Sequence, residues 1–215
     1  MSLRNVSLFS DLPESDLQAI SSVTATRTYP KNTIIISEGD DSDSLYAILS
    51  GKVKVFLSDD EGREIIINIQ GAGEYFGELA LLDDAPRSAS VMTLEETRLA
   101  VISKSAFEEC LTKHPELALR IIRELSTRLR HLTQNVKSLA LMDVYGRVAR
   151  TLLEMAEPTG DKLEIRQKLT QRDIASMVGA SREMVSRILK DLSTGGYITI
   201  QNKTITINEK LPPGW

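Results

Sequence analysis

The chain has 215 residues, of which 41% are apolar, 26% charged and 5% aromatic, and its formal net charge at pH 7 is −4. This composition can fill a packed core and excludes a disordered chain, and no apolar run approaches the ~18 residues of a membrane span. The first residues carry no pattern of a secretory signal, and one cysteine, Cys110, cannot form an internal disulfide or a multi-cysteine metal site. We therefore expect a cytoplasmic protein of one large or two small domains, without a membrane partner.

The charge is unevenly distributed along the chain. Residues 1–140 hold 15 Lys and Arg against 21 Asp and Glu, a net of −6, whereas residues 141–215 hold 11 against 9, a net of +2. The overall negative charge taken alone argues against a nucleic-acid partner. The difference between the two parts predicts that they have different partners.

Short runs rich in β-branched residues occupy the segment from residue 29 to residue 102. The runs lie at 33–36, 45–49, 53–56, 65–67 and 99–102, and turn-forming residues separate them at 38–41, 50–51 and 59–62. Evenly spaced short strands of this kind are typical of a closed or rolled antiparallel sheet. The first domain is predicted to be a β-barrel or β-roll.

Residues 76–91 combine the groups that a phosphate-bearing ligand needs. Gly77 permits close backbone approach, and the stretch from Glu78 to Leu82 can form one helical turn whose free N–H groups face an anion. Arg87, expected at the start of a strand, can grip a phosphate at two points, and Ser88 adds a hydroxyl donor. A carboxylate beside a phosphate is useful if the ligand also has a sugar hydroxyl to donate to Glu78. The alternative interpretation is a surface Glu–Arg pair of little energetic value.

The same stretch resembles the phosphate-binding cassette of cyclic-nucleotide-binding domains. It has their Phe-Gly-Glu-Leu opening at 76–79 and their Pro-Arg-Ser-Ala close at 86–89, and the upstream residues 39–53 are also similar. The resemblance implies that Glu78 takes the ribose hydroxyl while Arg87 and Ser88 take the cyclic phosphate. The ligand-binding residues that we predict are Gly77, Glu78, Leu79, Arg87, Ser88 and, as explained below, Thr133.

A long helix is predicted from Pro115 for about seven turns. Proline suits the first helical position, and Glu116 is favoured by the helix dipole. Apolar residues recur at spacings of three and four at 118, 122, 125, 129, 132, 136 and 139, and Leu117 and Ile121 form a second strip able to rest on the β domain. The main strip fits either an amphipathic helix packed on its own core or a parallel coiled coil that makes a dimer.

Two short helices and a hairpin are predicted between residues 166 and 207. Thr170 caps the first helix and Gly179 ends it, and Ser181 caps a second helix with apolar residues at 185, 188, 189 and 192. Alternating residues at 197–200 and 204–207 flank a turn at 201–203 and predict a hairpin wing. Two helices joined by a tight glycine turn make a helix-turn-helix.

The second of these helices has a polar face suited to DNA. Arginine can bond guanine O6 and N7, and Glu183 can accept from a cytosine amino group. Arg166, Lys168, Arg172 and Lys203 are expected to contact phosphates around it. A helical hairpin with a solvated charged face is the alternative. The predicted DNA-binding residues are Arg172, Ser181, Arg182, Glu183, Ser186, Arg187, Lys190 and Lys203.

Residues 171–190 and 139–153 resemble the helix-turn-helix and the preceding hinge of the cyclic-AMP receptor protein family. With the cassette and the long helix between them, the likeness covers essentially the whole chain in the same order. It implies a homodimer through the long helix, cyclic AMP as ligand, double-stranded DNA and RNA polymerase as partners, and TGTGA-like half-sites. Glu183, Ser186 and Arg187 also match the related fumarate-nitrate regulators, whereas Arg182 favours the receptor-protein branch.

The sequence departs from the family pattern at the nucleotide base. Two adjacent hydroxyl residues of the long helix hold the adenine in that family, and the matching positions here are Leu132 and Thr133. Only Thr133 matches, so cyclic AMP is the leading ligand while cyclic GMP and a cyclic dinucleotide stay open. We expect no metal, no iron–sulfur cluster and no haem, because the chain lacks an N-terminal cysteine cluster and its two histidines, His114 and His131, are interpreted as solvated helix residues.

The sequence as a whole predicts an α+β protein. An antiparallel β-roll that binds a cyclic nucleotide occupies residues 1–110, a long dimerisation helix residues 111–138, and a winged helix-turn-helix residues 139–215. We expect a transcription regulator and not an enzyme, since no Ser/His/Asp or paired-carboxylate set is present. The alternatives are a regulator with another effector, such as cyclic GMP, cyclic di-GMP or none, and a nucleotide-binding module that controls a protein partner.

Overall fold

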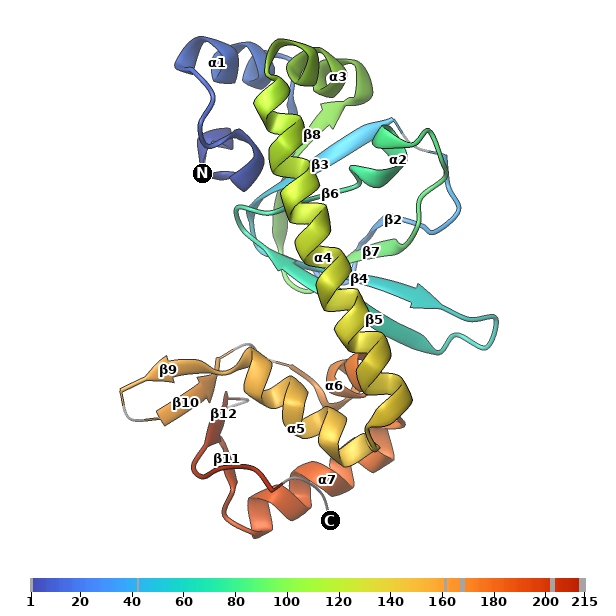
Figure 1. Ribbon diagram of the computed structural model, residues 1–215, viewed down its shortest axis with the longest axis vertical. Helices are drawn as coiled ribbons and strands as arrows, with labels where there is room; N and C mark the ends of the chain where they lie inside the picture. Colours follow the sequence, from blue (N-terminus) through green and yellow to red (C-terminus); the bar gives the residue numbers. More distant parts are fainter. Residues whose placement is uncertain (1, 42, 161, 167–168, 202–203, 213–215) are drawn as a thin grey trace. The chain divides into compact units, whose positions relative to one another are not determined.

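The computed structural model describes residues 2–41, 43–160, 162–166, 169–201 and 204–212 (Figure 1). The chain divides into two compact units: one comprises Met1–Leu57 and Ile66–Leu129, and the other comprises Ser58–Ile65 and Arg130–Trp215. No helix among the described residues combines the length and the apolar character needed to cross a membrane.

The first unit is a β-roll with helices at its two chain ends. Among its described residues, eight strands form two four-stranded sheets, in the orders β1-β8-β3-β6 and β2-β7-β4-β5. The elements in chain order are the 3-10 turns η1 (Leu3–Asn5) and η2 (Ser7–Phe9), α1 (Glu14–Ser22), β1 (Ala25–Tyr29), β2 (Ile34–Ile36), β3 (Ser44–Ser50), β4 (Lys52–Ser58), β5 (Glu64–Gly71), β6 (Tyr75–Phe76), α2 (Leu79–Leu82), β7 (Ser90–Thr93), β8 (Thr97–Ser103), α3 (Lys104–Lys113) and α4 (Pro115–Leu141). The predicted antiparallel roll is confirmed.

Strand β3 is buried on both faces, and its alternation separates two cores. Leu45, Ala47 and Leu49 pack with the N-terminal turns and the helices, whereas Ile48 packs with residues of both sheets inside the roll. Successive strand residues point to opposite faces, so a continuous apolar run suits a strand covered on both sides. Burial on both faces explains why this segment reads as an unbroken apolar run in the sequence.

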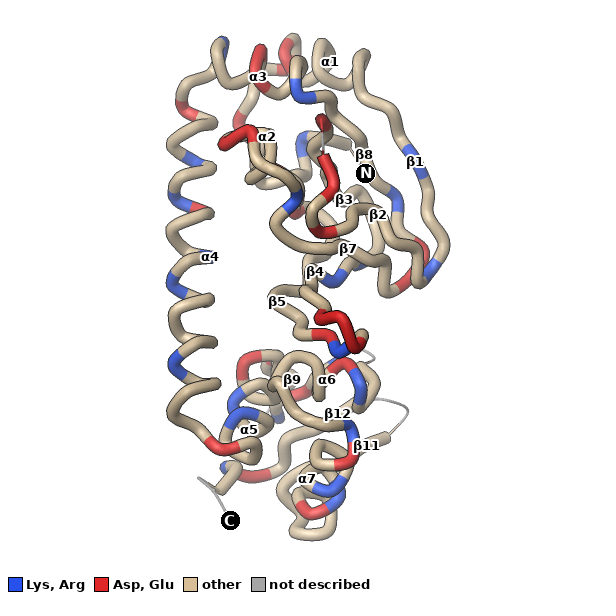
Figure 2. Tube along the Cα trace, turned by 90° about the vertical axis from the view of Figure 1, so that its right-hand side faces the viewer, with Lys and Arg blue, Asp and Glu red and all other residues tan. Residues whose placement is uncertain are grey.

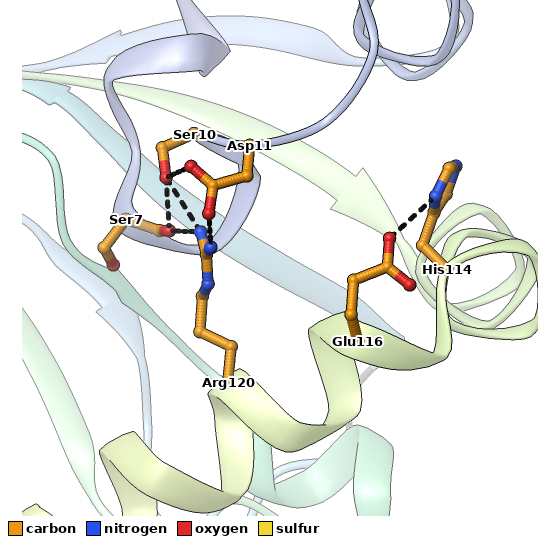
Figure 3. A network of polar contacts seen from close by, with 6 residues as sticks. All are labelled: Ser7, Ser10, Asp11, His114, Glu116 and Arg120. Carbon is orange, nitrogen blue, oxygen red and sulfur yellow. Dashed lines mark hydrogen bonds and ion pairs between the residues drawn. The ribbon is translucent and has the colours of Figure 1, made fainter.

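The N-terminal turns are fastened to α4 by one arginine (Figure 3). Arg120 Nη1 donates to the Ser7 carbonyl at 2.6 Å and to Ser10 Oγ at 2.8 Å, and Arg120 also pairs with Asp11. On either side of Arg120 in the sequence, Leu117 and Ile121 are buried in the helix-covered core, as the second apolar strip predicted.

His114 and Cys110 lie close to this junction. The His114 side chain is 15% exposed and contacts Asp16 at 3.3 Å and Glu116 at 3.2 Å, so the interpretation of His114 as a solvated helix residue is wrong. It lies at the end of α3, between the carboxylates of two other helices. Cys110 is buried as expected, and burial raises the pKa of its thiol to about 11.

The second unit holds the helix-turn-helix. Helices α5 (Val144–Met155), α6 (Gln171–Val178) and α7 (Arg182–Thr194) share one core with a sheet in the order β11-β12-β10-β9. The strands are β9 (Glu157–Thr159), β10 (Lys162–Ile165), β11 (Ile198–Gln201) and β12 (Thr204–Ile207). The predicted wing hairpin is confirmed as β11 and β12, while its turn residues 202 and 203 lie outside the described residues.

Local signals set the ends of the two short helices as predicted. Thr170 and Asp173 form a reciprocal capping box at the start of α6, and Ser181 caps α7 through the Met184 N–H. Gly179 ends α6 at a φ of 60°, in the left-handed region that favours glycine. These caps leave only three residues, 179–181, between the helices, so the second helix starts in a new direction.

Candidate functional site

The loop from β6 to β7 forms a compact cassette in the first unit. Its single helical turn, α2, follows Glu78 directly, as predicted. Gly77 has a φ of +87°, and a Cβ at this position would lie 2.3 Å from Arg87 Nη1. The glycine is therefore required both by the backbone conformation and by the close approach of the arginine.

Arg87 is 5% exposed and is held by main-chain oxygens. Its Nη1 donates to the Gly77 carbonyl at 2.7 Å and its Nη2 to the Ser44 carbonyl at 2.6 Å. The prediction that Arg87 starts a strand is wrong, because β7 begins at Ser90. Arg87 lies in the preceding loop, where its own N–H donates to the Asp40 carbonyl at 2.9 Å. The backbone of Arg87 is therefore bonded to the loop that contains Asp40 and not to a neighbouring strand.

The guanidinium of Arg87 keeps capacity for an anion. It has five N–H donors, and the two carbonyl bonds fix its plane without neutralising its charge. Burial lowers the pKa of Arg87, with opposing contributions that include the charge of Glu78. No carboxylate forms an ion pair with Arg87 within the described ranges. A buried, oriented and unneutralised arginine is suited to bind a phosphate at two points.

Glu78 is 2% exposed and is paired with the long helix. Its Oε1 accepts from Arg128 Nη1 at 2.6 Å, and Arg128 Nη2 donates to the Tyr75 carbonyl at 3.2 Å. The Arg128 guanidinium also lies over the Tyr75 ring, 5.3 Å from its centroid. Arg128 was not predicted from the sequence, because 50 residues separate it from Glu78 and nothing in the local pattern of α4 marks it.

The burial of Glu78 predicts a pH dependence of folding. Burial raises the pKa of this carboxyl above the usual range of a glutamate, against the opposing charge of Arg128. At pH values between the ordinary pKa of a glutamate and the raised pKa of Glu78, the native chain holds a proton that the unfolded chain has lost, so this group's contribution to stability falls as the pH rises through that window. We expect Glu78→Gln to reduce the slope of the unfolding free energy against pH by up to ~1.4 kcal/mol per pH unit, which is the limit for one proton.

Urea unfolding of the ligand-free protein at several pH values measures this slope. The matched control is Glu61→Gln, since Glu61 has a 73% exposed side chain and makes only a surface ion pair with Arg63. Equal slopes for Glu78→Gln and the wild type would show that the buried carboxyl is ionised throughout the range.

The remaining predicted ligand residues are placed less closely together. Ser88 follows Arg87 and is exposed, and Leu79 is 41% exposed at the start of α2. Thr133 is an exposed residue of α4 in the part of the chain assigned to the second unit, so its role in binding stays a prediction. Of the predicted ligand residues, the structure brings the buried side chains of Glu78 and Arg87 into one cluster with Gly77.

Helix α7 has one buried face and one exposed face. Val185, Ile188, Leu189 and Leu192 are buried in the core of the second unit. Ser186 is half-buried, and the exposed polar residues predicted to contact DNA on this helix and its caps are Ser181, Arg182, Glu183, Arg187 and Lys190. Charges of both signs lie along α7 (Figure 2). This face offers directed hydrogen-bonding groups and only a small excess of positive charge.

The two short helices meet at a hollow of about 440 Å³. It is lined by Thr170, Gln171, Arg172 and Arg182, which belong to the starts of α6 and α7. Arg166 is exposed and contacts Glu164 at 3.3 Å. Lys168 and Lys203, predicted to contact phosphates, lie outside the described residues.

Arg147 of α5 positions the turn between the two helices. Its Nε donates to the Val178 carbonyl at 2.7 Å and its Nη2 to the Gly179 carbonyl at 3.4 Å, while Nη1 donates to the Met142 carbonyl at 2.8 Å. These bonds satisfy carbonyls at the ends of α6 and α4, which have no partner within their own helices. Sequence reasoning gave Arg147 no such role, because its partners lie up to 32 residues away.

Comparisons with known proteins match both units. A model of the cyclic nucleotide-binding domain matches residues 26–114, and a model of the Crp-like helix-turn-helix domain matches residues 146–210. The CRP-like cAMP-activated global transcriptional regulator of Mycobacterium tuberculosis is 34% identical over 211 residues, covering 96% of this chain and 94% of that protein.

Two further proteins are similar over most of their length. The cAMP-activated global transcriptional regulator Vfr of Pseudomonas aeruginosa is 37% identical over 190 residues, covering 84% of this chain and 88% of that protein. The structure of the c-di-GMP responsive global regulator CLP of Xanthomonas campestris has a TM-score of 0.77 and 27% identity, and the match covers 92% of this chain and all of that one.

Proposed function

The chain belongs to the CRP-like family of DNA-binding transcription regulators with a cyclic-nucleotide-binding domain, and we propose that it is a homodimer whose affinity for DNA is gated by cyclic AMP. In this proposal residues 1–110 sense the nucleotide, residues 111–138 dimerise, and residues 139–215 bind DNA. The observation that carries it is that Glu78 and Arg87 are both buried in the cassette of a chain that also has a capped helix-turn-helix.

The cyclic phosphate and the ribose hydroxyl of cyclic AMP each have a matching group in the cassette. The cyclic phosphate carries one negative charge, which suits the buried and oriented guanidinium of Arg87 and the hydroxyl of Ser88. The ribose 2′-hydroxyl can donate to Glu78, whose carboxylate already has one partner in Arg128. A carboxylate repels a free phosphate, so a ligand that has both a phosphate and a donor hydroxyl fits both residues.

The Glu78–Arg128 pair supplies a route from the ligand to the long helix. A ligand hydroxyl that donates to Glu78 changes the strength of the hydrogen bond that Glu78 accepts from Arg128, and Arg128 belongs to α4. Contacts made in only one geometry of the dimer shift the population toward it, and ~1–3 kcal/mol changes DNA affinity by one to two decades. In the favoured geometry the two α7 helices lie one DNA turn apart.

Dimerisation is supported by an apolar stripe on α4. Ile122 is 57% exposed and Val136 is 65% exposed, and the other exposed apolar residues of the stripe are Leu129, Leu132 and Leu139. Their spacing of three and four is that of a parallel coiled coil. We propose that a second copy of the chain covers this stripe.

Val136→Glu is expected to weaken the dimer by about 100-fold or more, because it places two like charges in the proposed coiled-coil core. Sedimentation equilibrium over a range of concentrations measures the change in dissociation constant. Gln134→Glu, an equal change in charge at an exposed position of the same helix outside the stripe, is the matched control. Dimers of unchanged affinity in the Val136 variant would contradict the proposed interface.

Calorimetric titration tests the effector, and a DNA-binding assay on the same preparation tests the output. We expect cyclic AMP to bind and to strengthen binding to a palindrome with TGTGA-like half-sites by about 5- to 150-fold. Cyclic GMP and cyclic di-GMP are titrated in parallel. Tighter binding of either one would replace cyclic AMP as the effector. Nucleotide binding without any effect on DNA affinity would instead favour a module that controls a protein partner.

A further inference from the structure

Gln70 is a buried polar residue with an acceptor that the fold does not use. It lies on β5 and is 1% exposed. Its Nε2 donates to the Tyr75 carbonyl at 3.0 Å, whereas its Oε1 is buried and has no hydrogen-bond partner among the described residues. Such acceptors are rare in native proteins because burial removes their bonds to water.

The amide of Gln70 belongs to the same polar cluster as the cassette. The Tyr75 carbonyl accepts from both Gln70 Nε2 and Arg128 Nη2, and Arg128 in turn donates to Glu78. The bond from Nε2 also determines which end of the amide is the acceptor, since a flipped amide would oppose two oxygens. Oε1 is therefore the unused acceptor of a polar cluster that also holds the carboxylate to which we assign the ribose hydroxyl.

We propose that Gln70 Oε1 accepts a hydrogen bond from the amino group of the bound adenine and makes Gln70 a base-reading residue. This inference rests on the proposed binding of cyclic AMP. Cyclic AMP carries hydrogen-bond donors only at its 2′-hydroxyl and at its exocyclic amino group, because its cyclic phosphate and ring nitrogens have none. With the hydroxyl assigned to Glu78, the donors that remain are the two N–H groups of the amino group, of which we assign one to Gln70, and the other is available for the predicted contact with Thr133.

The test uses the full-length protein and two ligands that differ in one group. Purine riboside 3′,5′-cyclic monophosphate is cyclic AMP without the amino group. We expect the wild type to bind it about tenfold more weakly than cyclic AMP, the effect of one hydrogen bond and one unsatisfied buried acceptor. In Gln70→Met, which keeps the length of the side chain but has no such acceptor, the ratio of the two affinities is expected to fall well below the wild-type value, toward one.

Gln18→Met is the matched control, since Gln18 is exposed on α1, and it is expected to keep the wild-type ratio. A second readout needs no variant: the 13C resonance of the Gln70 side-chain carbonyl is expected to shift with cyclic AMP and not with the analogue. Equal binding of the two ligands by the wild type, or a wild-type ratio in Gln70→Met, would overturn the role of Gln70 and leave the proposed function standing. Failure of the wild type to bind cyclic AMP would overturn both.

Discussion

Arg87→Ala is expected to weaken cyclic AMP binding by about 100-fold or more and to remove the ligand's effect on DNA binding. Truncating one partner of a buried, charge-assisted hydrogen bond typically costs ~2–5 kcal/mol, and ~2.8 kcal/mol is a factor of 100. The side chain is 5% exposed and is oriented by the Gly77 and Ser44 carbonyls, so no exposed cation can take its place. Calorimetric titration and DNA binding with and without ligand measure the two effects.

Two further variants separate the charge of Arg87 from its geometry. Arg87→Lys keeps the charge but lacks the planar fork, so we expect a smaller loss of affinity than in Arg87→Ala. Arg63→Ala removes an arginine whose side chain is 75% exposed and forms only surface ion pairs, and it is expected to bind the nucleotide normally. Wild-type nucleotide affinity in a folded Arg87→Ala, shown by its thermal unfolding, would exclude the cassette as the phosphate site.

Arg182→Ala is expected to weaken binding to the specific palindrome by ~1–3 kcal/mol per half-site and to relax the preference for the base that it contacts. Arg182 is exposed at the first position of α7, beside the hollow that it shares with Arg172. Because the second part of the chain has a net charge of only +2, weak non-specific binding gives base contacts a large share of the affinity. Fluorescence anisotropy with wild-type and substituted half-sites measures both effects.

Lys190→Ala is expected to give a contrasting result. Lys190 lies further along α7 than Arg182, and we propose that it contacts a phosphate instead of a base. It is expected to weaken binding to all sequences equally and to lower the slope of log affinity against log salt by about one per half-site. Lys162→Ala on β10, an exposed lysine away from the recognition helix, controls for the loss of charge. Equally weak binding of wild type and Arg182→Ala to every sequence would contradict direct reading of bases by Arg182.

Local chemistry explains the elements that were predicted correctly. Pro115 starts α4, Gly179 ends α6, and Thr170 and Ser181 cap the two short helices, and each of these signals acts through the residue's own backbone or its neighbours within three positions. Strand β1 was not predicted, because four of its five residues are exposed and its sequence lacks the alternation of apolar and polar residues that marks a half-buried strand. Its place is set by pairing with β8, more than 65 residues later in the chain.

The sequence by itself determined the order of the parts, the antiparallel roll, the helix-turn-helix with its caps, and the identity of Gly77, Glu78 and Arg87 as one cassette. Only the tertiary structure revealed the partners of that cassette: Arg128 on Glu78, the Ser44 carbonyl on Arg87, and the buried amide of Gln70. The physical reason is the separation along the chain between the groups that interact. Capping and turn formation depend on groups a few residues apart, whereas burial of a charge and the choice of its partner depend on segments that only folding brings together.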